Sequence, residues 1–272
     1  MEHLSVFSYP HWAITPISNL IAELTMGSGA LASLVYCIHV VRRDRVIWPL
    51  WMFAGAGVMT IWETVVDLFE HIAYPSDGAR IVLYHWLGRD IPLYCFFIYL
   101  CYFAGPGAWL YQRILEGLTK AQFIKIILVT ILACATVEPI LVHFDWWTYY
   151  GAHPFNWTGL PMHWWFSNAT TVVFVPTACA VLRKHVLAGD AQTWIFVPFM
   201  IMACWSAKAV DLPVIFAFYA TTDMLWLSLA ALSTIVLALL ALCGIVRAVA
   251  VDGKAPYRPN QFVASGVFQS RF

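Results

Sequence analysis

The chain has 272 residues, of which 61% are hydrophobic and only 11% are charged. Water-soluble globular domains carry about 25% charged residues, and disordered chains lack apolar side chains in this excess. The 15 basic and 15 acidic side chains balance, which excludes the basic surface that nucleic-acid binding requires. The composition therefore predicts an integral membrane protein whose partners are membrane lipids and not nucleic acid.

A transmembrane helix needs about 20 consecutive, mostly apolar residues. The sequence contains seven stretches of this kind, at 17–41, 47–73, 91–113, 121–144, 163–184, 191–219 and 224–250. The loops between them are too short to fold alone. We predict an all-α, polytopic membrane protein with seven transmembrane helices, which forms a single domain at 1–250 and ends in a polar cytoplasmic tail at 251–272.

Basic residues in the short loops predict the orientation, because lysine and arginine are enriched on the cytoplasmic side of a membrane. With seven spans, four basic clusters fall on one side: Arg42, Arg43 and Arg45; Arg113, Lys120 and Lys125; Arg183 and Lys184; Arg247, Lys254, Arg258 and Arg271. The other side has only Arg80 and Arg89. We expect a multi-pass protein of the plasma (inner) membrane, with the N-terminus outside and the C-terminus in the cytoplasm.

The stretch 47–73 contains four ionisable side chains near its end, Glu63, Asp67, Glu70 and His71. The spacings from the first to the others place all four on one face of a helix. A charge at membrane depth costs roughly 2.5–3.5 kcal/mol on insertion scales, so each such residue is a candidate for function. Glu63 is the deepest of the four, and we expect Glu70 and His71 to leave the membrane.

Later helices add further polar groups at membrane depth, namely Glu138, Asn168, Lys208 and Asp211. In the predicted topology these groups lie in the outer half of the membrane, where the carboxylates should crowd one cavity. Like charges in a low dielectric favour keeping one carboxylic acid protonated, which is what a general acid requires. Alternatively, Lys208 and Asp211 pair with each other or with the carboxylates of 47–73 and only fix helix packing.

Aromatic side chains make up 16% of the chain. Many stand at predicted helix ends, where they are typical of the membrane interface. Rings beside a protonating carboxyl would also suit a substrate that becomes a carbocation, through cation–π attraction, although packing explains any single ring equally well. We assign substrate binding to six residues: Trp62, His71, Tyr149, Trp165, Asn168 and Lys208.

Histidines gather on the predicted outer side, where seven of the nine lie: His3, His11, His71, His85, His143, His153 and His163. A metal site is an alternative interpretation of this cluster. However, the sequence contains no HExxH motif and no histidine box of the kind that membrane desaturases use, so no ligand spacing supports a metal. We predict neither a metal nor a cofactor.

Two groups of residues resemble known families. Glu63 in the second helix, with Asp211 or Asp223 late in the chain, resembles the acids of integral-membrane terpene cyclases from meroterpenoid pathways. A second set resembles the Glu, Tyr-x-Tyr and Gly-x-Pro arrangement of membrane carotenoid hydratases: Glu138, Trp147-Thr148-Tyr149-Tyr150, Pro154-Phe155, Gly159-Leu160-Pro161 and Trp164-Trp165. Both resemblances rest on the topology and these residues, and both imply acid chemistry on a long isoprenoid.

These observations predict an enzyme, in the isomerase or lyase class, that starts cyclisation or hydration of a lipophilic isoprenoid by protonation. Glu63 would donate the proton, Asp67 or Asp211 would tune Glu63 or remove the final proton, and Glu138 would be a second acid–base group. The sequence lacks DDxxD and a phosphate-binding loop, which fits protonation better than loss of a diphosphate.

Two other functions remain open at this point. Buried acids and a lysine–aspartate pair at depth also suit a proton-coupled small-molecule transporter, although no internal repeat is visible. Ser206-Ala207-Lys208 with Asp211 prompts a comparison with retinal proteins, but a retinal lysine is expected in the last helix and Lys208 lies in the sixth of seven.

Overall fold

The seven predicted stretches all form helices that are long and apolar enough to cross a membrane. In the computed structural model, which describes residues 10–78 and 81–250, the spans are Pro16–Asp44, Trp48–Glu70, Leu93–Leu115, Lys120–His143, Met162–His185, Asp190–Ala220 and Met224–Val249. Each begins and ends within three residues of its predicted position. The chain is thus a multi-pass membrane protein. The predicted polar tail at 251–272 lies outside the described residues.

Capping side chains fix where several of these helices begin. The Thr15 side chain accepts a hydrogen bond from the Ser18 backbone N–H at the start of the first helix. Thr119 and Gln122 form a capping box at the start of the fourth span. In this arrangement the two side chains accept hydrogen bonds from two backbone N–H groups that have no partner inside the helix. The Asp223 carboxylate accepts from the Leu225 N–H at the start of the last helix.

The chain order of elements is α1 (Pro16–Asp44), α2 (Trp48–Met59), η2 (Thr60–Trp62), α3 (Glu63–Glu70), β1 (Ile72–Ala73), β2 (Val82–Trp86), β3 (Arg89–Pro92), α4 (Leu93–Tyr99), η3 (Leu100–Ala104), α5 (Gly105–Leu115), α6 (Lys120–His143), β4 (Thr148–Tyr149), α7 (Met162–His185), η4 (Asp190–Ile195), α8 (Phe196–Lys208), η5 (Ala209–Asp211), α9 (Leu212–Ala220) and α10 (Met224–Val249).

Three spans depart from α-helical geometry at their middle. A 3₁₀ turn, η2, precedes Glu63; a π-helical segment, η3, follows Tyr99; and a second 3₁₀ turn, η5, follows Lys208. Turns of these kinds inside helices often mark functional positions, because they change the direction in which later side chains point. The residues next to all three turns line or adjoin the cavity described below.

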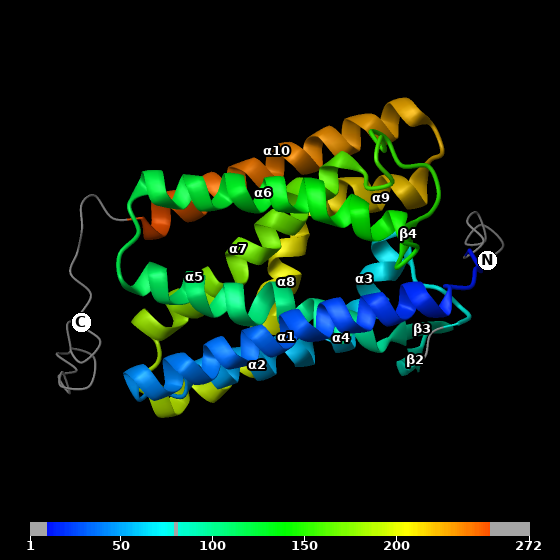
Figure 1. Ribbon diagram of the computed structural model, residues 1–272. Helices are drawn as coiled ribbons and strands as arrows, with labels where there is room; N and C mark the ends of the chain where they lie inside the picture. Colours follow the sequence, from blue (N-terminus) through cyan, green and yellow to red (C-terminus); the bar gives the residue numbers. More distant parts are fainter. Residues whose placement is uncertain (1–9, 79–80, 251–272) are drawn as a thin grey trace.

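Four short strands lie at the end of the bundle where α1 begins, which we call the strand end (Figure 1). Strands β1 and β4 pair antiparallel, with Ile72 opposite Tyr149. Strands β2 and β3 form a hairpin whose turn, Leu87-Gly88, has two positive φ angles of 50° and 73°, as a type I′ turn requires. The prediction of an all-α chain was therefore wrong for these two loops, which form ribbons.

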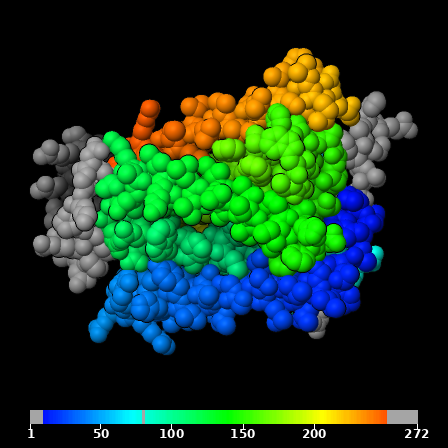
Figure 2. Space-filling view, turned by 45° about the horizontal axis from the view of Figure 1, so that its top comes forward, coloured from blue at the N-terminus to red at the C-terminus, as the bar shows by residue number. Residues whose placement is uncertain are grey.

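Helix α7 lies at the centre of the bundle and packs against α5, α6, α8 and α10 (Figure 1). Helix α2 packs closely on α8, where a Cβ atom on Gly55 would lie 2.7 Å from the Met200 Sδ and 3.2 Å from the Phe196 carbonyl oxygen. Helix α6 packs mainly on α7 and α10. In the space-filling view a hollow lies between α6 and α5 (Figure 2).

Candidate functional site

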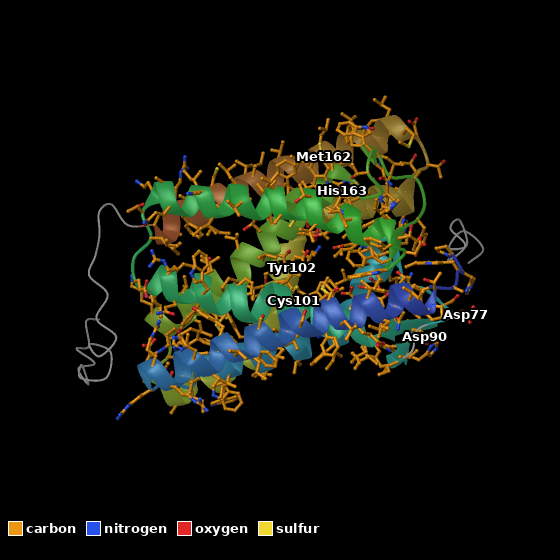
Figure 3. All side chains as sticks on the ribbon, in the orientation of Figure 1. Asp77, Asp90, Cys101, Tyr102, Met162 and His163 are labelled. Carbon is orange, nitrogen blue, oxygen red and sulfur yellow. The ribbon has the colours of Figure 1, made fainter. Side chains whose placement is uncertain are left out.

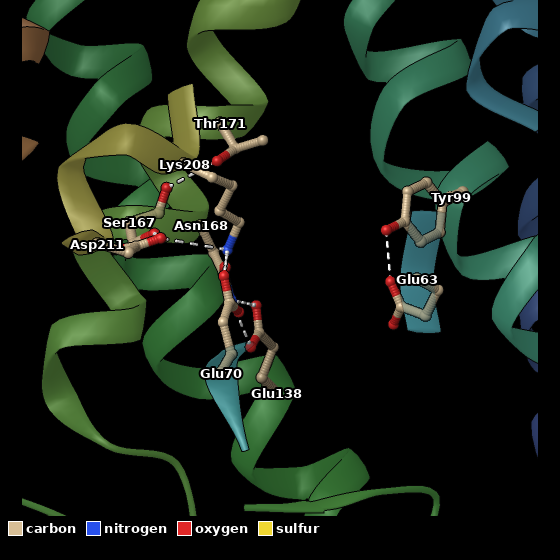
Figure 4. A network of polar contacts seen from close by, with 9 residues as sticks. All are labelled: Glu63, Glu70, Tyr99, Glu138, Ser167, Asn168, Thr171, Lys208 and Asp211. Carbon is tan, nitrogen blue, oxygen red and sulfur yellow. Dashed lines mark hydrogen bonds and ion pairs between the residues drawn. The ribbon is translucent and has the colours of Figure 1, made fainter. Parts of the chain in front are cut away.

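A cavity lies between α3, η3, α6, α7 and α8 in the strand-end half of the bundle. Its polar lining residues are Glu63, Glu70, Glu138, Asn168, Thr171 and Lys208. Its aromatic lining residues are Tyr74, Tyr99, Tyr102, Phe103, Trp147 and Tyr149. Tyr102 lies about midway along the bundle (Figure 3). The polar groups form two separate clusters on opposite sides of the cavity (Figure 4), which we call the Glu63 cluster and the Lys208 cluster.

The Glu63 cluster is a buried carboxyl held by two tyrosine hydroxyls. The Tyr74 hydroxyl donates to Glu63 Oε1 at 2.6 Å, and the Tyr99 hydroxyl donates to Oε2. Glu63 itself is only 7% exposed. Both carboxyl oxygens therefore accept a neutral hydrogen bond, and neither is paired with a cation in the described part of the chain.

The Lys208 cluster is centred on the Lys208 ammonium group. Its Nζ lies 2.8 Å from Glu70 Oε1 and 3.7 Å from Asp211 Oδ2, and it donates to Asn168 Oδ1 at 3.0 Å (Figure 4). Asp211 also accepts a hydrogen bond from the Ser167 hydroxyl at 2.5 Å. The cluster thus ties α3, α7 and the α8–η5 junction together through one cation.

Asn168 links this cation to Glu138. Its side-chain Nδ2 donates to both oxygens of Glu138, at 3.0 and 3.1 Å, while its Oδ1 accepts from Lys208. Because a carboxylate offers only acceptors and an ammonium only donors, these partners fix the orientation of the amide. Glu138 is 5% exposed, and its carboxyl faces the cavity beside the aromatic rings.

The ribbon of β1 and β4 closes the cavity at the strand end. Its residues Ile72 and Tyr149 line the cavity directly. The Arg89 guanidinium fastens the ribbon from the far side, where it donates to the Ile72 carbonyl and to the Tyr150 hydroxyl, both at 2.7 Å. Burial raises the pKa of Tyr149 well above its usual value, so its hydroxyl keeps its proton.

Three histidines pack around Phe218 beyond the ribbon. The ring centroids of His71, His153 and His163 lie 4.7, 4.8 and 6.4 Å from that of Phe218. Burial, aided by the charge of Arg89, lowers the pKa of His71 to about 4. Burial, aided by the neighbouring His71, lowers the pKa of His153 to about 3. Both imidazoles are therefore neutral at physiological pH, as their aromatic surroundings require.

Within residues 10–78 and 81–250, no group of three or more histidine, cysteine, aspartate or glutamate side chains is arranged to hold a metal ion. The histidines around Phe218 belong to an aromatic packing cluster.

Several predicted site residues meet in this cavity. Glu63, Glu138, Tyr149, Asn168 and Lys208 line it, although they come from five separate segments of the chain. This is the crowding of polar groups that the sequence predicted.

The other predicted residues lie beside the cavity or away from it. Asp211 is fully buried behind Lys208, and Asp67 is 1% exposed on the next turn of α3 after Glu63. His71 stacks between Tyr150 and Phe218. Trp62 is 37% exposed and packs edge-on against Trp86 and Trp205. Trp165 packs against the apolar cluster around Trp164 and Phe218.

Glu70 and His71, which we expect to leave the membrane, are both 3% exposed and thus buried within the protein. Glu70 forms the closest ion pair with Lys208. It is seven residues from Glu63 and shares its helical face. Strand β1 begins two residues after Glu70 and pairs with β4, so this end of the helix packs against protein.

Sequence reasoning also missed the two hydrogen-bond donors to Glu63. Tyr99 lies within an apolar stretch, where an aromatic ring is typical of packing, and Tyr74 falls in a predicted loop. Neither pairing has a local signal, since the tyrosines lie 36 and 11 residues from Glu63 along the chain. Comparisons with protein-family models, curated proteins and solved structures found no match for this chain.

Proposed function

We propose that this protein is a membrane-embedded enzyme in which Glu63 protonates a long isoprenoid and so starts its cyclisation or hydration through a carbocation. The observation that carries the proposal is a buried carboxyl, bound by two tyrosine hydroxyls, that faces a cavity lined by aromatic rings. Each part of this arrangement has a role in such a reaction.

The tyrosines make Glu63 a suitable donor. When Tyr74 and Tyr99 both donate to the carboxyl, the acid's own proton can point into the cavity. After the proton leaves, the same two hydrogen bonds become charge-assisted and stabilise the carboxylate. Interactions that strengthen as charge develops lower the barrier, because they stabilise the transition state more than the ground state.

Glu63 is the lining carboxyl that is set apart from the cation of the cavity. Among the described lining residues, three carboxyl groups, Glu63, Glu70 and Glu138, share one cation, Lys208. Glu70 contacts that cation directly, and Glu138 reaches it through Asn168, whereas Glu63 lies on the opposite side. Glu63 is therefore the described lining carboxyl with no link to Lys208, and the hydrogen bonds to it come from tyrosine hydroxyls.

The rest of the cavity suits a cationic intermediate. Rings of Tyr99, Tyr102, Phe103 and Trp147 line it, and their faces attract a carbocation by cation–π interaction. Glu138, on the opposite side from Glu63, adds negative charge and can accept the last proton, either from the carbocation or from a water molecule that captures it.

The way into the cavity suits a lipid-soluble substrate. The ribbon of β1 and β4 closes the strand end, while α6 packs away from η3 and α5 and leaves a hollow on the side of the bundle (Figure 2). That side faces the hydrocarbon core, so we expect the substrate to enter from the bilayer.

Product analysis tests this proposal. Membranes that contain the wild-type protein would be fed a panel of linear isoprenoid alkenes and their terminal epoxides in D₂O, then extracted for mass spectrometry. We expect a product from an alkene that is isomeric with it or one water heavier and carries one carbon-bound deuterium. No product from any member of the panel, with well-folded protein, would contradict the proposal.

The distribution of buried ionisable groups favours the enzyme over the alternative function, a proton-coupled transporter. Within the described residues, every buried aspartate, glutamate, arginine and histidine lies in the half of the bundle nearer the strand end, whereas a proton path needs ionisable groups along its whole length. Proton-coupled uptake into vesicles would identify a carrier.

A retinal-type Schiff base is disfavoured because the Lys208 amine is engaged by Glu70, Asn168 and Asp211.

We further propose that the strand end faces outward from the plasma (inner) membrane, with the N-terminus outside. The basis is the concentration of lysine and arginine in the loops at the opposite end. In a Cys243→Ala background, a membrane-impermeant maleimide should label Asp77→Cys in intact cells and Arg42→Cys only after permeabilisation. Both positions are exposed; Asp77 lies at the strand end (Figure 3), and Arg42 lies in the last turn of α1, at the other end. The reverse pattern would overturn the orientation.

A further inference from the structure

Helices α5 and α6 follow one another in the chain, but they pack on other helices rather than on each other. The short turn at 116–119 joins them at the end of the bundle away from the strand end (Figure 1). Helix α5 packs mainly on α7, η3 and α1, and α6 packs mainly on α7 and α10. A lateral groove of about 380 Å³ therefore separates the end of α5 from the first turns of α6.

The lining of this groove, which we call the α5–α6 groove, changes from basic to apolar towards the middle of the bundle. Arg113 lies in the last turn of α5, and Lys125 lies in the second turn of α6. One helical turn deeper on the same helical faces lie Trp109 and Val129. The other lining residues are Leu118, Gln122, Ile126 and Thr130. This order of charge and apolar surface matches a headgroup followed by an acyl chain.

The basic end of the α5–α6 groove carries a net positive charge. The Arg113 guanidinium donates to Glu116 Oε2 at 2.7 Å, which occupies one of its five N–H groups and leaves the others for a ligand. Lys125 is exposed and takes part in none of the ion pairs that the described residues form. The three side chains together have one positive charge, which the single negative charge of a phosphodiester would balance.

Two other lateral grooves show what is special about this one. One lies between α7, α8 and α10, and the other lies between α2, α4 and β2. Neither has a charged lining residue, so each suits the acyl chains of any lipid. Basic pockets between transmembrane helices are typical sites for anionic lipid headgroups, and the α5–α6 groove combines such a pocket with an apolar wall.

We propose that the α5–α6 groove binds an anionic glycerophospholipid of the bilayer. The phosphate lies between the Arg113 guanidinium and the Lys125 ammonium group, where charge-assisted hydrogen bonds hold it. One acyl chain lies along Trp109 and Val129 towards the middle of the membrane. The lipid thus fills the space that α5 and α6 leave between them. This site lies at the other end of the bundle from the strand end and is separate from the reaction proposed for Glu63.

Native mass spectrometry of the purified protein in detergent measures this binding. The probes are dioleoylphosphatidylglycerol, which is anionic, and dioleoylphosphatidylcholine, which has the same acyl chains and no net charge. We expect one phosphatidylglycerol to bind at least about ten-fold more tightly than phosphatidylcholine, because the two cations attract only the anionic headgroup. Equal affinities for the two lipids would overturn the inference.

Removing the two cations tests the headgroup contact. Arg113→Gln with Lys125→Gln should weaken phosphatidylglycerol binding at least about ten-fold and leave phosphatidylcholine binding unchanged. The matched control, Arg42→Gln with Lys184→Gln, removes two exposed cations from the same end of the bundle but outside the groove, and it should change neither affinity. If the double variant does not fold, Lys125→Gln alone, which breaks no ion pair, should still weaken phosphatidylglycerol binding about three-fold.

Filling the apolar part of the groove tests the acyl-chain contact at constant charge. Val129 is 58% exposed, so Val129→Trp enlarges a side chain outside the buried core and should weaken the binding of phosphatidylglycerol. Glycerol 3-phosphate has the charge without acyl chains and should not compete with the lipid.

Three results with these probes would overturn the inference. The first is wild-type affinity for phosphatidylglycerol in the variants that lack the groove cations, or an equal loss in the matched control. The second is unchanged binding in Val129→Trp, which would place the lipid elsewhere. The third is competition by glycerol 3-phosphate, which would make the groove a site for free anions.

Discussion

Glu63→Gln should abolish product formation from every isoprenoid that the wild type converts, with a loss of at least about 10³-fold in kcat. Glutamine has nearly the same size as glutamate and can still accept the hydrogen bond from Tyr74, but it has no acidic proton. General acid catalysis contributes about 10²–10⁴-fold, and here the proton also creates the reactive carbocation. The measurement is product yield per folded protein, by mass spectrometry.

Matched variants around the same cavity give the control. Tyr99→Phe removes one donor to Glu63 but keeps the ring, so we expect activity to fall by about 10- to 100-fold, in line with the loss of one hydrogen bond to a developing charge. Glu138→Gln keeps the bond to Asn168 through its amide oxygen and should change the ratio of alkene to alcohol products more than the rate of substrate loss. Full activity in Glu63→Gln would remove Glu63 as the donor.

Lys208→Met should be the most destabilising single substitution in the site. It leaves Glu70, 3% exposed, and Asp211, fully buried, without their shared cation. Removing one partner of a buried ion pair costs about 3–5 kcal/mol, because the remaining charge stays buried. We expect a strongly lowered melting temperature in detergent, measured by loss of monodisperse protein after heating.

A double variant distinguishes lost charge compensation from lost packing. Lys208→Met with Glu70→Gln removes both members of the 2.8 Å pair, so it should be more stable than Lys208→Met alone, as replacing a whole buried pair is often close to neutral. Arg43→Met breaks an exposed ion pair with Asp44 and should change stability by less than about 1 kcal/mol. If the double variant is less stable than the single one, packing of the Lys208 stem is the main contribution.

The positions of the polar residues along the chain explain how much of the site could be predicted. The depth of Glu63 follows from its place within an apolar stretch, because hydropathy and a rise of about 1.5 Å per residue locate a side chain along the membrane normal. The meeting of Glu138, Asn168 and Lys208 follows from the same argument applied to three helices, since groups at equal depth avoid lipid by facing one another.

The rotation of side chains about each helix could not be predicted in the same way. The π-helical segment after Tyr99 and the 3₁₀ turns before Glu63 and after Lys208 break the regular period, and one extra residue rotates later positions by about 100°. Trp62, which we assign to substrate binding as a ring beside the carboxyl group, directly precedes Glu63 but is 37% exposed and does not line the cavity.

The sequence by itself determined the seven spans and the height of each ionisable group along its helix, because both depend on local composition and on the fixed rise of a helix. Tertiary structure alone decided that Tyr74 and Tyr99 bind Glu63, that Glu70 and Lys208 pair across α3 and α8, and that β1 meets β4. Each of these contacts joins segments that lie on different elements. Such contacts are selected by the free energy of packing the whole bundle, which no local pattern in the sequence encodes.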